Sequence, residues 1–308
     1  MMMQKSAGLA WLLAGLAAIA EEGGSGHYTP GSVASFLDRT PIVPSLIVRY
    51  NGVFFQSSYS PPVPGVARLE ASRLGSSLTL AWRPDVTPAP GLAYGCSVTV
   101  PYVWAEVSGD FTAGAAPAHR TSRADGLGDI ILIPALLDYT VTRELHLDLR
   151  CLVYAPTGAY EADRLANPGK NFWTFSPMLG LLYWGQQNGV EASVFGGLDF
   201  NTENSATDYR SGTQFHLDGT LAQHFRALGG LAGVGATGFW YEQLTGDSGA
   251  GARLGPAEGY VVGAGPVLSY MRNVAGKNLI VELKWLHELE GNHRLEGDYL
   301  WLKCLLRF

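Results

Sequence analysis

The last ten residues of the chain alternate between two kinds of side chain, and this period of two constrains the fold more than any other feature. One face of the implied β-strand carries Leu300, Leu302, Cys304, Leu306 and Phe308. The opposite face carries Tyr299, Trp301, Lys303, Leu305 and Arg307. Because strand side chains point alternately to the two faces of a sheet, one face is compatible with lipid and the other with a polar interior.

The same alternation recurs upstream. Leu145, Leu147 and Leu149 oppose His146, Asp148 and Arg150, and similar patterns cover 190–199, 214–225 and 278–288. In a soluble sandwich the apolar face would point inward, whereas in a membrane barrel it faces lipid and the charges line the lumen. Strand length favours the barrel, because the segments run to roughly 10 to 15 residues, near the length of a tilted spanning strand.

Twelve segments are candidates for such strands. They are 44–58, 72–83, 92–108, 127–139, 143–156, 171–184, 189–201, 211–226, 230–245, 257–271, 279–290 and 297–308.

The connections between these segments alternate in length. Long polar connections are expected at 109–125, 157–170 and 246–255, and short ones at 140–142, 185–188 and 227–229. Residues 84–91 form a longer link than this rhythm requires. Long outer loops and short periplasmic turns are typical of an outer-membrane barrel with both chain ends in the periplasm. The sequence therefore predicts an all-β fold, an antiparallel transmembrane β-barrel of about twelve strands.

The first twenty residues predict a cleaved signal peptide. Lys5 precedes the apolar run Ala7 to Ala17, and Ala18-Ile19-Ala20 is a small-x-small cleavage pattern, so the cut is expected before Glu21. The apolar run is shorter than the ~20 residues of a spanning helix. Three regions follow: a signal peptide at 1–20, an N-terminal segment at 21–44 and the barrel at 45–308. The segment at 21–44 carries apolar side chains that need burial, which favours a hatch inside the lumen over a loose periplasmic strand.

Composition excludes several classes of function. Cleavage would remove one lysine and take the net charge from −6 to −7, and an acidic surface disfavours nucleic acid as a partner. Cys96, Cys151 and Cys304 are an odd, scattered set, which indicates neither a disulfide framework nor a zinc site. We expect no metal and no cofactor.

Several short segments, in order along the mature chain, resemble a known family. They include Gly126-Leu127-Gly128-Asp129, Pro156-Thr157-Gly158-Ala159-Tyr160 and residues 167–175, NPGKNFWTF. Together they are similar to the family named for the meta-pathway of phenol degradation. The resemblance implies an outer-membrane barrel and a link to the uptake of aromatic compounds, and it transfers no catalytic residues. The final strand also resembles the assembly signal of bacterial outer-membrane proteins, which implies recognition by the barrel-assembly machinery through Phe308.

Strand parity places a set of polar and aromatic residues on the luminal side, and these are the candidate solute pathway. The set is Arg49, Arg73, Arg83, His146, Asp148, Arg150, Glu191, Asp199, His216, Asp218, Glu282, Lys284, Trp301, Lys303 and Arg307. Two readings remain open at this point. The charges either fill a packed, non-conducting lumen or line a constricted passage for a small amphipathic solute.

Enzyme readings are weaker. Gly246-Asp247-Ser248-Gly249 superficially resembles the nucleophile segment of trypsin-like proteases, but no matching histidine segment precedes it, and a glycine-rich stretch between two strands is more simply a loop. His146, His216 and His224 would allow an outer-membrane lipid hydrolase, although such a site should face lipid and these histidines lie on luminal parity. The sequence thus predicts a non-enzymatic channel in the bacterial outer membrane, in contact with its lipid, for small, partly apolar and possibly aromatic molecules. The alternative function is a structural barrel without transport.

Overall fold

A computed structural model describes residues 20–41, 43–60, 66–113, 116–252, 256–294 and 296–308. The predicted signal peptide, apart from Ala20, lies outside these residues. The strands are β1 Ser45–Tyr59, β2 Val66–Arg83, β3 Leu92–Ala113, β4 Ala116–Leu127, β5 Ile130–Thr140, β6 Leu145–Ala155, β7 Thr174–Trp184, β8 Val190–Asn201, β9 Gln214–Ala227, β10 Gly230–Gln243, β11 Tyr260–Val274, β12 Lys277–Asn292 and β13 Glu296–Arg307. Two short 3-10 turns, η1 Glu22–Gly24 and η2 Phe36–Asp38, precede them. No helix in the described residues is long and apolar enough to cross a membrane.

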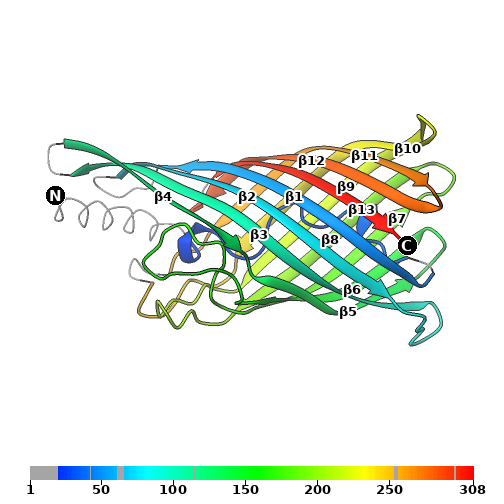
Figure 1. Ribbon diagram of the computed structural model, residues 1–308, viewed down its shortest axis with the longest axis horizontal. Coiled ribbons are helices and arrows are strands. Elements are labelled where there is room, and N and C mark those ends of the chain that lie inside the picture. The colour runs from blue at the N-terminus through cyan, green and yellow to red at the C-terminus, as the bar shows by residue number, and fades with distance from the viewer. Residues whose placement is uncertain (1–19, 42, 61–65, 114–115, 253–255, 295) are drawn as a thin grey trace.

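The strands form one antiparallel barrel that closes on itself (Figure 1). Strands adjacent in sequence pair with each other, except that β5 pairs with β3 instead of β4. β1 completes the circle by pairing with β13 over twelve residue pairs from Ile47↔Arg307 to Ser58↔Glu296. The ring contains twelve of the thirteen strands, because β4 pairs only with β3. The predicted fold class is therefore confirmed.

The two ends of the barrel differ in their connections. One end, the turn end, holds Ser45, the backbone hydrogen bond from Phe308 to Leu46, and the connections 84–91, 141–144, 185–189, 228–229 and 275–276. The other, the loop end, holds the longer connections 156–173, 202–213 and 244–259 together with the short 293–295. Long and short connections alternate much as predicted, and 84–91 is again the longest link at the turn end.

The region 109–125 differs from its prediction as a long loop. It forms the outer part of β3 and most of β4, which pair from Tyr102↔Leu127 to Ala113↔Ala116. The predicted strand 127–139 is also interrupted, because β4 ends at Leu127 and β5 begins at Ile130. The inner part of β3 pairs with β5 instead. A hairpin that projects past the membrane has water on both faces, so its sequence lacks the apolar face by which a strand is recognised.

Side-chain burial gives the direction of each face. In β13, Leu302 is 39% exposed, whereas its neighbour Lys303 is 1% exposed. In β12, Leu283 and Trp285 are likewise exposed on the outer surface, while Glu282 and Lys284 are buried inside. This is the inverse of a soluble protein and the pattern expected when the outer surface contacts hydrocarbon.

Residues 20–41, which we call the luminal segment, run through the barrel from the loop end towards β1 at the turn end (Figure 1). The backbone N–H of Ala20 donates to the carbonyl of His293 at the loop end, at 2.8 Å. Tyr28, Val33 and Leu37 then pack into three successive clusters with the inner faces of the strands. The prediction that both chain ends lie at the periplasmic end is therefore wrong for this segment, whose start lies at the opposite end from Phe308.

Candidate solute pathway

The charged interior of the barrel binds the backbone of the luminal segment. Lys303 Nζ donates to the carbonyl oxygens of Gly31 and Ser32 at 2.9 and 3.0 Å. Lys284 Nζ donates to those of Val33 and Ala34 at 3.0 and 3.2 Å. Both ammonium groups lie within 3.6 Å of the Glu282 carboxylate, which offsets part of the cost of burying them. Two strand lysines thus satisfy carbonyl groups that have no partner of their own in a sheet or helix.

Carboxylates of the barrel wall accept hydrogen bonds from donor groups of the same segment. Asp218 accepts hydrogen bonds from the Tyr28 hydroxyl at 2.9 Å and from the Gly31 N–H at 2.8 Å. Glu191 accepts one from the Phe36 N–H at 2.8 Å. The segment is therefore held in the lumen by both hydrogen-bond donors and acceptors of the barrel wall.

Further predicted residues form ion pairs around η2. Arg150 makes two hydrogen bonds to Asp148, at 2.6 and 2.8 Å, and one to the Asp38 carbonyl at 3.0 Å. Arg49 pairs with the Asp38 carboxylate at 3.0 Å. Trp301 donates from its indole nitrogen to the Pro30 carbonyl at 2.8 Å. These contacts belong to the packing of the luminal segment.

The structure does not bring the predicted arginines into one cluster. Arg83 lies at the turn end, where it lines a cavity of about 160 Å³ together with His146. Arg307 is half-buried at the same end, opposite Ile47. Arg73 lies in the loop-end half of the lumen, in a much larger cavity. Of the predicted set, only Arg73 and Trp301 contribute to that larger cavity in the described residues.

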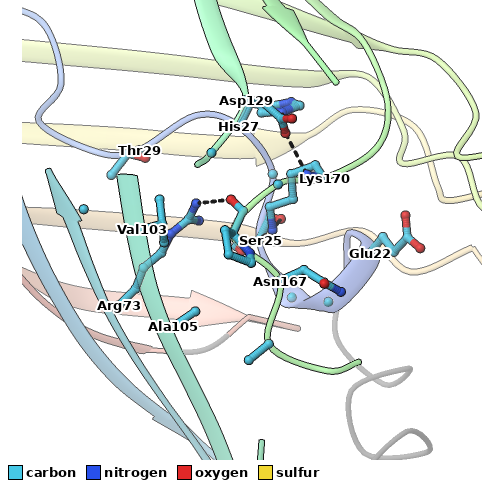
Figure 2. A pocket seen from close by; sticks show the side chains of 18 of the residues that line it. Glu22, Ser25, His27, Thr29, Arg73, Val103, Ala105, Asp129, Asn167 and Lys170 are labelled. Carbon is cyan, nitrogen blue, oxygen red and sulfur yellow. Dashed lines mark hydrogen bonds and ion pairs between the residues drawn. The ribbon is translucent and has the colours of Figure 1, made fainter. Parts of the chain in front are cut away.

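The larger cavity has a volume of about 720 Å³ and lies between the luminal segment and the wall formed by β1, β2 and β3. We call it the loop-end cavity. Wall residues include Phe55, Arg73 and Val103, and the connection 156–173 contributes Tyr160 and residues 164–170. Figure 2 shows Arg73 and Lys170 beside the luminal segment at Ser25. The volume is in the range of small-molecule sites in proteins.

Two cations face this cavity without a carboxylate within 4 Å in the described part of the chain. Arg73 donates to the Pro168 carbonyl at 3.4 Å. Lys170 Nζ donates to the carbonyl and, at 2.8 Å, to the hydroxyl of Ser25. Burial and the nearby positive charge of Arg73 lower the pKa of Lys170 to about 8, against the opposing effect of nearby acids. The two cations thus repel each other in a partly desolvated site.

Two acids of the cavity, Asp129 and Glu22, already accept several hydrogen bonds. Asp129 accepts from His27 Nε2 at 3.0 Å and from the backbone N–H groups of Gly158 and Lys170 at 2.9 and 2.6 Å. Glu22 accepts from Asn204 at 2.8 Å and Thr207 at 2.6 Å. Burial lowers the pKa of His27, despite the opposing effect of Asp129. Among the cations that line the cavity in the described residues, Arg73 and Lys170 are those without a carboxylate partner, since Arg294 pairs with Glu21.

Aromatic side chains form another part of the cavity wall. Phe55 and Tyr299 stack with ring centroids 4.4 Å apart, and Tyr154 stacks on His27 at 4.6 Å. The sequence prediction included neither Phe55 nor Lys170. Phe55 lies on the same face of its strand as Arg49, so the alternation of side chains could have predicted that it faces the lumen. Lys170 lies in a long connection, where no period indicates which side chains turn inward.

The histidines do not form a hydrolase triad. His146 pairs with Asp138 at 2.7 Å and His224 with Glu191 at 2.7 Å. His216 Nε2 lies 3.2 Å from Asp199 and 3.4 Å from the Ser176 hydroxyl, so acid and hydroxyl contact the same ring nitrogen. A triad needs the acid on one nitrogen and the nucleophile on the other. Within the described residues, no group of three or more His, Cys, Asp or Glu side chains is arranged to hold a metal ion.

Comparison with known proteins identifies the family. A profile described as putative MetA-pathway of phenol degradation matches residues 66–304, most of the chain. The chain belongs to this family. The predicted resemblance is thereby confirmed, and the match covers β2 to β13 of this MetA-pathway family member almost completely. A search among curated proteins finds no match.

Solved structures show the same fold at low sequence identity. The COG4313 outer membrane channel from Pseudomonas putida F1 is 16% identical, with a TM-score of 0.67 over 92% of this chain and 100% of that one. The β domain of the Bordetella autotransporter BrkA is 12% identical, with a TM-score of 0.52 over 86% and 98% of the two chains. This MetA-pathway protein shares the fold of both structures.

Proposed function

We propose that this protein is an outer-membrane channel for small amphipathic solutes, and that the loop-end cavity binds aromatic molecules that carry a negative charge. One observation carries the proposal. Arg73 and Lys170 face a cavity with an aromatic wall, and no carboxylate of the described residues lies within 4 Å of either cation. An aromatic carboxylate, sulfonate or phenolate would pair with the cations through its charge and stack on the aromatic wall through its ring.

The location of the site supports uptake from outside. In the outer membrane, the lipid-facing band of the barrel would contact hydrocarbon, the turn end would face the periplasm and the loop end the exterior. Residues of the long connections line the cavity, so an external solute would reach it first. Insertion into this membrane would use the final strand, which ends at Phe308, as the signal for the barrel-assembly machinery.

The chemistry of the cavity supports an anion over a neutral solute. A guanidinium or ammonium group gains more from an ionised acceptor than from a neutral one, particularly where protein has displaced water. The Phe55–Tyr299 pair offers ring faces and edges for offset or edge-on stacking. An anionic ring would also reduce the repulsion between the two cations. The cavity therefore selects a solute first by shape and apolar contact, and then by its negative charge.

Passage beyond the cavity requires the luminal segment to move. Trp301 in the cavity wall, and Lys303 and Lys284 beyond it, bind the backbone of residues 30–34. These contacts are hydrogen bonds to backbone carbonyl groups, so displacement of the segment exposes the charged wall to water and leaves the ring of strands intact. The same packed lumen favours the alternative function, a structural barrel that conducts nothing, and transport distinguishes the two.

Reconstituted protein provides the test. Liposomes with and without the protein are compared for uptake of benzenesulfonate, phenyltrimethylammonium and glucose, which are an aromatic anion, an aromatic cation and a neutral sugar. The proposal expects benzenesulfonate to enter fastest. If none of the three enters protein-containing liposomes faster than empty ones, the structural barrel is correct. If the cation enters as fast as the anion, the charge preference is wrong.

A further inference from the structure

The backbone nitrogen of Glu21 lies against a buried carboxylate at the loop end. Its N–H donates to Asp247 Oδ2 at 3.0 Å, and both residues are almost fully buried. Asp247 belongs to the connection between β10 and β11, whereas Glu21 is the second residue of the luminal segment. The contact therefore joins the start of the luminal segment to the barrel wall across 226 positions of sequence.

The Asp247 carboxylate has donors but no cation. Its Oδ2 also accepts from the Tyr209 hydroxyl at 2.6 Å. Its Oδ1 accepts from the Gly212 N–H at 3.0 Å and from Gln243 Nε2 at 2.7 Å. All of these donors are neutral, and no lysine, arginine or histidine nitrogen of the described residues lies within 4 Å. A buried carboxylate is costly unless a positive charge accompanies it.

The buried cation at this end of the barrel, Arg294, is committed to a different acid. Arg294 pairs with the side chain of Glu21 at 2.9 Å, and its guanidinium lies 4.0 Å over the ring of Tyr241. Gln214 donates to the other Glu21 oxygen at 2.7 Å. The Glu21 side chain thus has a counter-ion, whereas its backbone nitrogen points at the acid that has none.

The backbone of Glu21 is strained as part of a continuous chain. It adopts φ 67° and ψ 148°, a region that non-glycine residues rarely occupy. This strain requires the carbonyl group of the preceding residue, because φ describes how that group is rotated about the N–Cα bond of Glu21. An N-terminal residue has no such carbonyl, so hydrolysis of the bond between Ala20 and Glu21 would remove the strain.

We propose that this bond is the processing site and that the new α-ammonium group of Glu21 forms an ion pair with Asp247 that locks the luminal segment at the loop end. A leader peptidase would add water across the bond, which leaves a carboxylate on Ala20 and an amine on Glu21, and the amine takes up a proton. The Ala18-Ile19-Ala20 pattern is of the small-x-small type that such peptidases cut. The lock does not depend on which solute crosses the barrel.

The first test uses wild-type protein purified from outer membranes. Its mature sequence should begin at Glu21, and a different start overturns the proposal. Its α-amine should react with an acylating reagent about tenfold more slowly, or slower still, in the folded protein than in urea, because the ion pair holds it protonated and covered. Equal rates in the two states would also overturn it. Asp247→Asn should make the folded amine more reactive, since the neutral amide no longer stabilises the ammonium form.

A second test asks whether the charge of Asp247 and the position of the Glu21 ammonium group act through the same ion pair. Asp247→Asn should raise the open fraction in planar-bilayer recordings, and so should a Gly-Ser insertion between Ala20 and Glu21, which moves the ammonium group away. Asp163→Asn, which removes an exposed acid from another loop-end connection, is the matched control and should leave the recordings unchanged. The combined Asp247→Asn and insertion should be no more open than either alone, because both remove the same ion pair. Additive effects, or an insertion that leaves the barrel as closed as wild type, would refute the lock.

Discussion

Lys303 donates from Nζ to the carbonyl oxygen of Gly31 at 2.9 Å, so the last strand of the barrel holds the segment that precedes the first. β13 also pairs with β1, which begins where the luminal segment ends. Closure of the barrel and binding of the segment therefore use different parts of the same strand. Its backbone pairs with β1 to close the ring, and its luminal side chains bind the segment.

Leu302 and Lys303 should consequently fail in different ways when mutated. Leu302→Arg places a charge on the lipid face and should lower the free energy of unfolding by roughly 2 to 4 kcal/mol near the midplane. Lys303→Met leaves the lipid face intact but removes two hydrogen bonds to the luminal segment, so its main effect should be a larger conductance. Urea midpoints and bilayer recordings measure both. A midpoint for Lys303→Met as low as that for Leu302→Arg would contradict this division of roles.

Arg73 should determine the affinity for anions. Arg73→Met should weaken the binding of benzenesulfonate by about tenfold or more, the scale of one charge-assisted hydrogen bond. Arg68→Met makes the same change in charge on the same strand, at an exposed pair with Glu70, and should leave binding unchanged. Isothermal titration of the detergent-solubilised protein gives both constants. Equal losses in the two variants would mean that net charge, rather than the cavity, attracts the anion.

The charge of Lys170 should make anion binding depend on pH. Its pKa is lowered to about 8, so the ammonium form is present below that value and is lost as the pH rises through it. Benzenesulfonate keeps its charge throughout, so its affinity should fall between about pH 7 and about pH 9 because of the protein alone. Lys170→Met should bind more weakly at pH 7 and show little dependence over the same range. A variant that retains the full pH dependence would assign it to another group.

Much of the barrel was predictable because lipid outside and polar contacts inside impose a strict alternation on each strand. That alternation placed His146, Asp148 and Arg150 inside, where the structure has them. The alternation did not predict the β3–β4 hairpin, because a strand with water on both sides has no apolar face in its sequence. It also could not place the start of the luminal segment, because a segment without a regular period carries no signal of direction.

The site was less predictable than the fold for a related reason. Parity indicates that a residue such as Glu191 faces inward but not that it binds the Phe36 N–H, because that contact joins residues 155 positions apart. Most of the predicted set therefore packs against the luminal segment instead of lining the cavity. Lys170, which does line it, lies in a connection whose path depends on contacts with Ser25 and Asp129.

Closure of the barrel should make the folded protein resistant to detergent. In the described residues the ring of twelve strands is closed and β4 lies outside it, so the ring offers detergent no strand edge from which to unzip it. Unboiled samples should migrate differently from boiled ones in dodecyl sulfate gels, with far-UV dichroism of a β protein. A single mobility with and without heating, together with a helical spectrum, would be inconsistent with this fold.

The most direct test of the account is transport through a barrel whose luminal segment can be fixed in place. Val33 of the segment packs with Leu182 of β7 in one buried cluster, so Val33→Cys and Leu182→Cys, in a background with Cys96, Cys151 and Cys304 changed to serine, should form a reversible tether. Liposome uptake of benzenesulfonate should fall to the level of empty liposomes when the disulfide is formed and recover on reduction. Uptake that stays unchanged with the disulfide demonstrably formed would show that the solute does not pass by displacement of this segment.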